Sequence, residues 1–512
     1  REGIQVSRWR EQAPGWQFGT FVFIKSLNND RVWSTTYAPL QDEPDFYRVR
    51  FSQDKASYFR ETRNIDTRTD VIVSSEDNAE VRRVVLTNHG TRDASLEITS
   101  YLEVVLSQQG ADLAHPAFNK LFVETEHIPE NNALLASRRP RSVEEKRIYA
   151  LHQVTVDGAS VGSLQFETDR AKFLGRGRDI SRPVALHQPL SNSLGPVLDP
   201  IFSLRRQIRL GSGETGTLTF ITAQGAREEM AEVAEKYRDP GAIRRAFDLA
   251  FARGQVEYRF LNLSSQLLEA SQLALGHLFF PSPTRRRHGE TIARNQLSQR
   301  ALWTQGISGD NPIVLVNVAD TEEIDIVAET VRAHEFWRFK GLTVDLVILN
   351  SESSGYLAPM RDMIRDVVQL SQVPELDRPG GIFIRSTGQM SQGEVDLLYA
   401  AARVILRGGK SLAQQLECRL LPYPKPMTPM QEPDYVNRPV QLPDDLQFFN
   451  GYGGFSADGS EYIIPVKELQ VIGQLDGPVN IIWLLHWGHF GAGGRVYLCR
   501  EQPGKQTYSL VQ

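Results

Sequence analysis

Short apolar runs separated by turn residues fill the first part of the chain. Two such runs lie within Phe18–Tyr37 and flank Asn28-Asn29-Asp30, which predicts a β-hairpin. Two further runs flank Asn88-His89-Gly90, and we predict a second hairpin at this turn. Because strand signals recur as far as Thr222, we predict that residues 1–225 form a large antiparallel β-sandwich.

The spacing of apolar positions changes to a helical period after Glu228. Asp239 and Pro240 are typical of a helix start, with Asp as the N-cap and Pro in the first turn. Helical spacing continues through Ala242–Phe260 and Ser264–Leu278. Residues 226–300 are therefore predicted to be linker helices packed on the sandwich.

Strands and helices alternate between residues 301 and 417. The predicted strands are Ile313–Val318, Leu342–Leu349 and Gly381–Arg385. The predicted helices are Glu322–Lys340, Met360–Leu370 and Gly393–Arg407. This order predicts a small parallel α/β unit, so the fold class is multidomain, a β part followed by an α/β part. Ligands of such units bind beyond the carboxyl ends of the strands, here Val318–Asp320, Asn350–Ser354 and Ser386–Gly388.

A proline-rich stretch, residues 418–446, separates this unit from the last part of the chain. It contains P-Y-P-K-P-M-T-P-M-Q-E-P, which predicts an extended, semi-rigid linker. Phe448–Phe455 (F-F-N-G-Y-G-G-F) then begins a new module. We interpret residues 447–512 as the truncated start of a second β-sandwich.

Composition excludes several classes of protein. The apolar share of 41% and the charged share of 23% are typical of a soluble globular protein. A net charge of −5 provides no general attraction to nucleic acid. No apolar run approaches the roughly 20 residues of a membrane span, so we expect a soluble, cytoplasmic chain without a direct membrane span. The first residue is not Met, and the pattern begins as that of an interior fragment would.

Metal-ligand and cofactor patterns are also missing from the sequence. The 2 cysteines, Cys418 and Cys499, lie far apart, and no His-x-x-x-His pair occurs. Arg407–Ser411 (R-G-G-K-S) resembles a phosphate loop, but Val404 stands where the first glycine belongs and we predict a helix end there. We therefore expect no metal and no cofactor.

Five residues are candidates for substrate binding. Asp310 ends a glycine-punctuated loop and either binds a ligand or caps its own loop. His334 and Trp337 belong to an aromatic helix end (H-E-F-W-R-F), which suits a sugar platform or helix–sheet packing. Trp33 and Tyr37 suit an aromatic groove on the sandwich or its core. Residue chemistry leaves both alternatives open and identifies no catalytic residue.

Several blocks of sequence occur in a fixed order between the N-terminus and residue 465. They are V-W-S-T-T-Y-A-P, E-P-D-F-Y-R-V-R-F, A-H-P-A-F-N-K-L-F-V-E-T-E, F-L-G-R-G-R, L-W-T-Q-G-I-S-G-D-N-P-I-V-L-V and F-F-N-G-Y-G-G-F. Together they resemble the cyclic β-1,2-glucan synthases. The parent family is glycosyltransferase family 36, reclassified as the glycoside hydrolase family 94 phosphorylases.

This resemblance implies a large modular enzyme at the bacterial inner membrane. In that family a membrane glycosyltransferase uses UDP-glucose, a middle domain closes the ring, and a phosphorylase module follows. The present chain resembles the interior, with a β-supersandwich, linker helices and an α/β insert. The family's helical barrels and catalytic Asp have no matching position here. The implied partners are a β-1,2-glucan or another glucose polymer, and the remaining domains of the parent enzyme.

The last residues depart from the resemblance after Ile464. Shifting Gly493–Gln512 one base forward, with synonymous codons, permits E-A-G-Y-T-C-A-G-N-S-R-E-N-K-L-T-P-W-S, which is similar to the family's next block. We hypothesise that a frameshift lies between Val466 and Gly491. An out-of-frame tail has a pattern that was never selected to bury a face, so we expect it to lack a packed core.

Three functional hypotheses follow from these observations. The first is a non-catalytic interior segment of a β-1,2-glucan synthase, with scaffolding and glucan contacts. The second is an active transferase or phosphorylase. The third is a stand-alone carbohydrate-binding sandwich protein.

Overall fold

The structure is a computed structural model of the 512-residue chain. It describes residues 3–10, 17–140, 142, 145–158, 160–280, 282–351, 359–371, 375–417, 444–449, 454–459, 461–463, 495–498 and 508–510.

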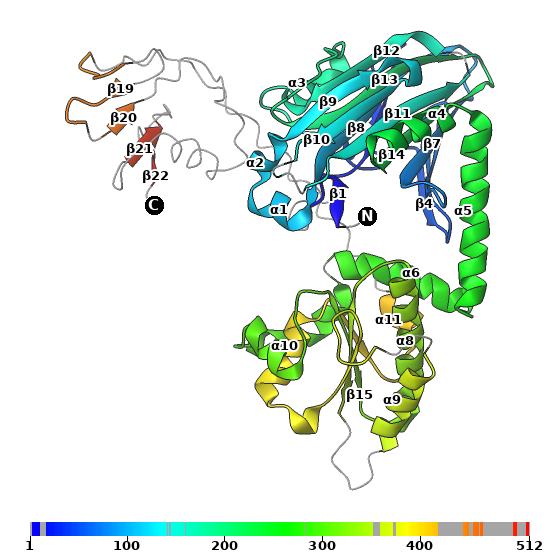
Figure 1. Ribbon diagram of the computed structural model, residues 1–512, viewed down its shortest axis with the longest axis vertical. Helices are drawn as coiled ribbons and strands as arrows, with labels where there is room; N and C mark the ends of the chain where they lie inside the picture. The colour runs from blue at the N-terminus through cyan, green and yellow to red at the C-terminus, as the bar shows by residue number, and fades with distance from the viewer. Residues whose placement is uncertain are drawn as a thin grey trace.

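Two antiparallel sheets form the N-terminal half (Figure 1). The first has the order β12-β13-β8-β2-β3, with β1 also paired to β8. Its strands are β1 (Ile4–Ser7), β2 (Phe21–Ser26), β3 (Val32–Ser34), β8 (Ala94–Gln108), β12 (Ser160–Asp169) and β13 (Pro200–Leu210). The predicted hairpin at Asn28-Asn29-Asp30 is confirmed, because it joins the antiparallel pair β2 and β3.

The second sheet has the order β4-β5-β6-β7-β14-β11-β10-β9. Its strands are β4 (Phe46–Phe51), β5 (Ala56–Thr62), β6 (Ile65–Val73), β7 (Ala79–Asn88), β9 (Val123–Ile128), β10 (Ala133–Arg138), β11 (Ile148–Asp157) and β14 (Thr215–Gly225). Apolar side chains of both sheets pack in one core, including Ile98 of β8 and Phe220 of β14. The predicted large antiparallel sandwich is therefore confirmed.

Strand β8 is buried on both faces, without a break from Leu96 to Ser107. One face contributes Leu102 and Val104 to the core between the sheets. The other face, through Tyr101, packs with Phe173 of α3 (Arg170–Leu174). Burial on both faces means that polar residues of β8, such as Glu97 and Glu103, are buried together with its apolar residues.

The predicted hairpin at Asn88-His89-Gly90 is wrong. Strand β7 belongs to the eight-stranded sheet and β8 to the six-stranded sheet, so this turn crosses between sheets. The Asn88 side-chain nitrogen donates to the carbonyl oxygens of Leu210 (3.1 Å) and Gly211 (3.1 Å), which ties this crossover to the one between β13 and β14. Two alternating runs around a turn suit a hairpin and a crossover equally well, and only the strand partners distinguish them.

Helices connect the sandwich to the second unit. They are α4 (Arg227–Lys236), α5 (Pro240–Phe260), α6 (Ser265–Phe279) and α7 (Gly289–Arg294). The Asp239 carboxylate accepts a hydrogen bond from the Gly241 N–H (2.9 Å), so Asp239 is the N-cap of α5. Met230 and Phe247 pack on the outer face of the eight-stranded sheet. From there α5 leads away from the sandwich to α6 and the second unit (Figure 1).

The second unit is a parallel sheet with the order β17-β16-β15-β18. Its strands are β15 (Ile313–Val318), β16 (Asp345–Asn350), β17 (Ile382–Ser386) and β18 (Val404–Arg407). Its helices are α8 (Ile324–Phe339), α9 (Pro359–Gln369), α10 (Gln392–Ala401) and α11 (Leu412–Leu416). Helices α6, α8 and α9 cover one face and α10 covers the other, as expected for an α/β unit.

The predicted helix Gly393–Arg407 is too long. Helix α10 ends at Ala401, and Val404–Arg407 forms the fourth strand, β18, beside β15. A short apolar run has no distinctive period, so pairing with β15 decides its conformation. The sequence R-G-G-K-S therefore lies between a strand and the short helix α11, not at a helix end.

Four short strands belong to the last module. They are β19 (Gly454–Phe455), β20 (Glu461–Ile463), β21 (Arg495–Leu498) and β22 (Tyr508–Leu510), which pair in that order. Residues 418–443 of the predicted linker lie outside the described residues, as does the side-chain burial of the tail beyond Ile463. The hypothesis of an out-of-frame tail stays a prediction. Within the described residues, no helix is both long and apolar enough to cross a bilayer.

Candidate functional site

A cleft lies between the sandwich and the α/β unit. It contains a cavity of about 630 Å³, lined by Trp9 and Gln109 on the sandwich side and by Phe279 and Asp310 on the other side. An adjoining cavity of about 500 Å³ shares Trp9, Gln109 and Phe279 and adds Phe280. In Figure 1, β1 and α1 (Gln109–Ala114) face α6 across this region. Ligand pockets are common at such interfaces between units.

The lining of the cleft combines aromatic rings with amide and carboxylate groups. Phe279 and Phe280, at the end of α6, are 41% and 51% exposed, and Trp9 is half-buried. Gln109 and Asn311 supply amides that both donate and accept hydrogen bonds. Rings bind the apolar face of a ligand and amides bind its hydroxyl groups, so this lining suits a polyhydroxylated ligand.

Asp310 is the one sequence candidate that lines the cleft. Its carboxylate is exposed and accepts a hydrogen bond from the Gln299 side chain (3.2 Å). Gly309 has a φ of +76°, and a Cβ there would lie 2.9 Å from side-chain atoms of Gln299 and Leu302. The loop needs glycine at this position. It precedes β15, so the cleft lies at the amino end of that strand and not at the carboxyl end that the sequence predicted.

His334 and Trp337 lie in the core, and their prediction as a sugar platform is wrong. Each side chain is 1% exposed. The His334 Nε2 is 2.8 Å from the Val344 carbonyl oxygen, and the Trp337 Nε1–H donates to the Ser271 carbonyl oxygen (2.8 Å). Burial lowers the pKa of His334 to about 4. These contacts leave no face of either ring open to a ligand.

The two sandwich candidates lie outside the cleft lining. Trp33, 2% exposed, packs between the sheets, so its prediction as part of an open groove is wrong. Tyr37 is 39% exposed, and its backbone N–H donates to the Tyr47 hydroxyl (3.1 Å). Binding of a sugar at Tyr37 stays a prediction.

The carboxyl ends of the parallel strands are occupied by the chain itself. The Asn317 side chain donates to the Tyr399 hydroxyl (2.8 Å) and accepts from Ser351 (2.7 Å). A Cβ at Gly408 would lie 1.9 Å from the carboxyl carbon of Glu323. A carboxylate therefore fills the turn where R-G-G-K-S would have to admit a phosphate.

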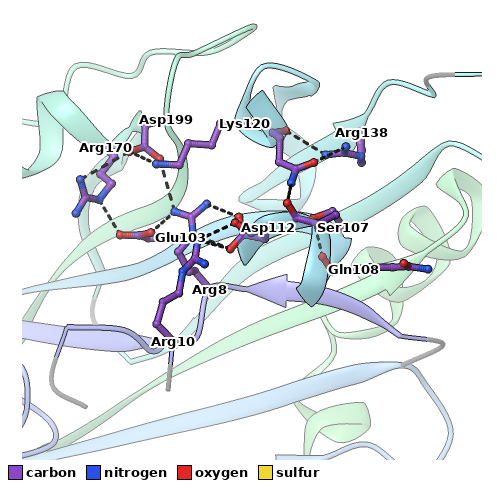
Figure 2. A network of polar contacts seen from close by, with 12 residues as sticks. Arg8, Arg10, Glu103, Ser107, Gln108, Asp112, Lys120, Arg138, Arg170 and Asp199 are labelled. Atoms are coloured by element: carbon purple, nitrogen blue, oxygen red, sulfur yellow. Dashed lines mark hydrogen bonds and ion pairs between the residues drawn. The ribbon is translucent and has the colours of Figure 1, made fainter. Parts of the chain in front are cut away.

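A buried network of ion pairs supports the sandwich side of the cleft (Figure 2). Arg8 pairs with Glu103 of β8 and with Asp112 of α1, while Arg170 binds the other oxygen of Glu103 at 2.7 Å. Arg10 pairs with the Asp112 carboxylate at 2.8 Å. Burial raises the pKa of Glu103, but the positive charges of Arg170 and Arg8 outweigh it and hold that pKa below its usual value.

Sequence analysis missed the aromatic lining, namely Trp9, Phe279 and Phe280. Phe279 and Phe280 directly follow the predicted helix Ser264–Leu278 and were not among the predicted binding residues. Two exposed rings at a helix end are a signal of a binding surface, but exposure is not visible in the sequence. Across the part of the chain that the structure describes, His, Cys, Asp and Glu nowhere gather in a group of three that could hold a metal ion.

Comparisons with known proteins find carbohydrate-active relatives. Residues 1–240 match the model of the glycosyl hydrolase 94 supersandwich domain. The chain is 32% identical over 483 residues to cyclic β-(1,2)-glucan synthase NdvB of Rhizobium meliloti (strain 1021), covering 91% of this chain and 17% of that protein. It is 22% identical over 246 residues to N,N'-diacetylchitobiose phosphorylase of Vibrio proteolyticus, covering 48% and 30%.

Solved structures add little to this assignment. A bacterial glucoamylase complexed with acarbose matches at 10% identity over 51% of this chain and 35% of that chain, with a TM-score of 0.32. A likeness at this score carries no argument. The assignment rests on the sequence matches, in which the chain spans less than a third of the length of either relative. Residues 1–240 are a glycosyl hydrolase 94 supersandwich domain, and the chain as a whole is similar to part of a cyclic β-(1,2)-glucan synthase.

Proposed function

We propose that this chain is a non-catalytic interior segment of a cyclic β-1,2-glucan synthase-like enzyme. In this proposal the sandwich and the α/β unit are a scaffold, and the cleft between them contacts a glucan. The remaining domains of the parent enzyme, at the bacterial inner membrane, are its partners. The observation that supports this proposal is that Asp310, Trp9 and Phe279 line one cleft.

Two further observations support a non-catalytic role. The chain spans 17% of the length of the related glucan synthase, so most of such an enzyme lies in other segments. The described helices serve as linkers and as the cover of the parallel sheet, and none of them is arranged as a barrel (Figure 1). An active phosphorylase would need a catalytic carboxylate in an enclosed pocket, and the catalytic Asp of the resembled family has no matching position in this sequence.

Binding and turnover measurements on the purified chain test the proposal. We expect linear β-1,2-glucan to bind in a calorimetric titration, and we expect no phosphate-dependent cleavage of it. Asp310→Asn should weaken binding, since it removes the charged acceptor from the cleft. Asp320→Asn is the matched control, because Asp320 is also exposed but caps the turn before α8.

Each other outcome favours a different function. Turnover by the purified chain would refute the non-catalytic role and favour a transferase or phosphorylase. Tight binding that the Asp310 variant leaves unchanged would favour a stand-alone carbohydrate-binding sandwich, with its groove elsewhere. A chain that binds no glucan leaves the scaffold role but removes the glucan contact.

A further inference from the structure

Three consecutive residues lie between the sandwich and the cleft. Arg8 and Arg10 belong to the ion network, and Trp9 lines the cleft. Arg8 is 5% exposed and pairs with Glu103 and Asp112. Arg10 binds Asp112 twice, since its guanidinium also donates to the Asp112 carbonyl oxygen at 3.0 Å. Trp9, between them, lines both cavities of the cleft.

The backbone explains this division. Strand β1 pairs with β8, and the Arg8 N–H continues that ladder by donating to the Glu103 carbonyl oxygen at 3.2 Å. Successive side chains of an extended segment point to opposite sides. When both arginines are bound on the network side, the indole between them faces the cleft. Figure 2 shows the side chains of Arg8 and Arg10 directed towards the same carboxylate, that of Asp112.

This buried ion network adds little net stability to the fold. Asp112 is 1% exposed, and burial of its charge offsets much of the attraction that the ion pairs provide. A buried ion pair has strict geometry, so it fixes the position of the chain segment that bears it. The segment fixed here is the one that bears Trp9.

A polar group beside Trp9 also points to a ligand. The side-chain oxygen of Gln5 is buried and has no hydrogen-bond partner within the described part of the chain. Gln5 lines the same cavity of about 500 Å³ as Trp9. A buried amide oxygen normally accepts a hydrogen bond, and rotation of the half-buried Gln5 side chain towards the cavity would let this oxygen accept one from a ligand hydroxyl.

We propose that Trp9 is the stacking platform for a hexose ring of a bound glucan, and that Arg8 and Arg10 are positioning residues that hold it. The inference rests on the proposed glucan contact and deepens it. The flat indole binds the apolar face of a sugar ring, while Gln5 and Gln109 bind its hydroxyl groups. Phe279 and Phe280 line the same cavity.

A titration with linear β-1,2-glucan tests the platform. Trp9→Ala should weaken binding about tenfold or more, as expected for loss of a central aromatic contact. Trp9→Phe should restore part of it. Phe51→Ala is the matched control, because Phe51 of β4 is 67% exposed and lies outside the residues that line the cleft. We expect the control to bind as the wild-type chain does.

Fluorine NMR of the 5-fluorotryptophan-labelled chain tests the positioning role without any ligand. The chain has 7 tryptophans, and Trp9→Phe identifies the resonance of Trp9. In Arg10→Ala that resonance should move towards the position of solvent-exposed tryptophan and sharpen, while the others stay in place. Arg10→Lys should restore most of the shift, because it keeps the charge beside Asp112. Arg10 is the better variant than Arg8, being 18% exposed and so less needed for folding.

Separate results overturn the inference and the proposed function. If the wild-type chain binds the glucan and Trp9→Ala binds it equally well, the platform is wrong and the glucan contact stands. If Arg10→Ala leaves the Trp9 resonance unchanged, the positioning role is wrong. If the wild-type chain binds no glucan, the proposed contact fails, and the platform fails with it.

Discussion

Arg8 and Glu103 are joined twice, by a backbone hydrogen bond and by a buried ion pair between their side chains. The Arg8 N–H donates to the Glu103 carbonyl oxygen at 3.2 Å. The side chains pair as well, and each is only 5% exposed. This double contact attaches the N-terminal segment to the central strand β8 of the sandwich.

Removal of the Glu103 charge should therefore be strongly destabilising. Glu103→Gln leaves the buried guanidinium of Arg8 without its main partner, and Arg170 loses one as well. We expect the free energy of unfolding to fall by about 3–5 kcal/mol, measured by urea denaturation. Asp93→Asn is the control, because its pair with Arg209 is 50% and 65% exposed and should contribute at most about 1 kcal/mol. Equal losses in the two variants would contradict the structural importance of burial.

The folded chain should become less stable as pH is lowered, because His152 is buried in its neutral form. Its ring is fully buried between Phe202 and Phe220, and its nitrogens lie 2.9 Å from the Ser100 hydroxyl and 3.0 Å from the Thr222 hydroxyl. Burial lowers its pKa to about 3. In the unfolded chain His152 has a pKa of about 6.5, so between about pH 6.5 and pH 3 the unfolded state binds a proton that the folded state does not. The contribution is complete above about pH 6.5 and is lost as pH falls towards 3.

The size of this effect is measurable by unfolding at two pH values. Between pH 7 and pH 4.5 we expect a loss on the order of 2–3 kcal/mol from this residue. His152→Asn should flatten that part of the pH profile. His187→Gln, a change at an exposed histidine, should leave the profile as it is. A profile that is the same with and without His152 would show that its titration does not matter.

Trp337→Phe should reduce stability without changing glucan binding. The indole N–H donates to the Ser271 carbonyl oxygen inside α6, so phenylalanine removes that hydrogen bond and fills less of the core. We expect a loss of about 1–3 kcal/mol in the free energy of unfolding. Glucan affinity, measured where the variant is fully folded, should equal that of the wild-type chain. A weakened affinity would return Trp337 to the set of binding residues.

The nucleotide sequence tests the origin of the C-terminal tail. We predict an insertion or deletion between the codons of Val466 and Gly491, and a shifted frame that encodes a peptide similar to E-A-G-Y-T-C-A-G-N-S-R-E-N-K-L-T-P-W-S. Restoring the frame should produce a chain that continues the family resemblance beyond Ile464. An uninterrupted gene without that hidden peptide would exclude a frameshift.

Periodicity predicted most of the secondary structure, because each element follows a local rule. The strand Ile313–Val318 has the predicted bounds. Asp239 forms the predicted cap, since only residues next to it take part. Asp310 was found as a candidate because glycine spacing marks a special loop, and the structure places it in the cleft.

The errors occur where distant residues decide. Val404–Arg407 is a strand because β15 lies beside it, and no local period shows this. The indoles of Trp33 and Trp337 are equally aromatic in the sequence, whether they end in the core or on the surface. Trp9 was missed for the same reason.

The sequence by itself determined the kind of most elements, the order of the units and the family resemblance. Backbone period, capping and turn chemistry act over a few residues, and family resemblance is written in the residue order itself. Tertiary structure alone decided which sheet each strand joins, which aromatic rings are buried, and that Trp9 faces Asp310 across one cleft. Those relationships depend on residues that lie far apart in the sequence, about three hundred positions in the case of Trp9 and Asp310, and that come together only when the chain is packed.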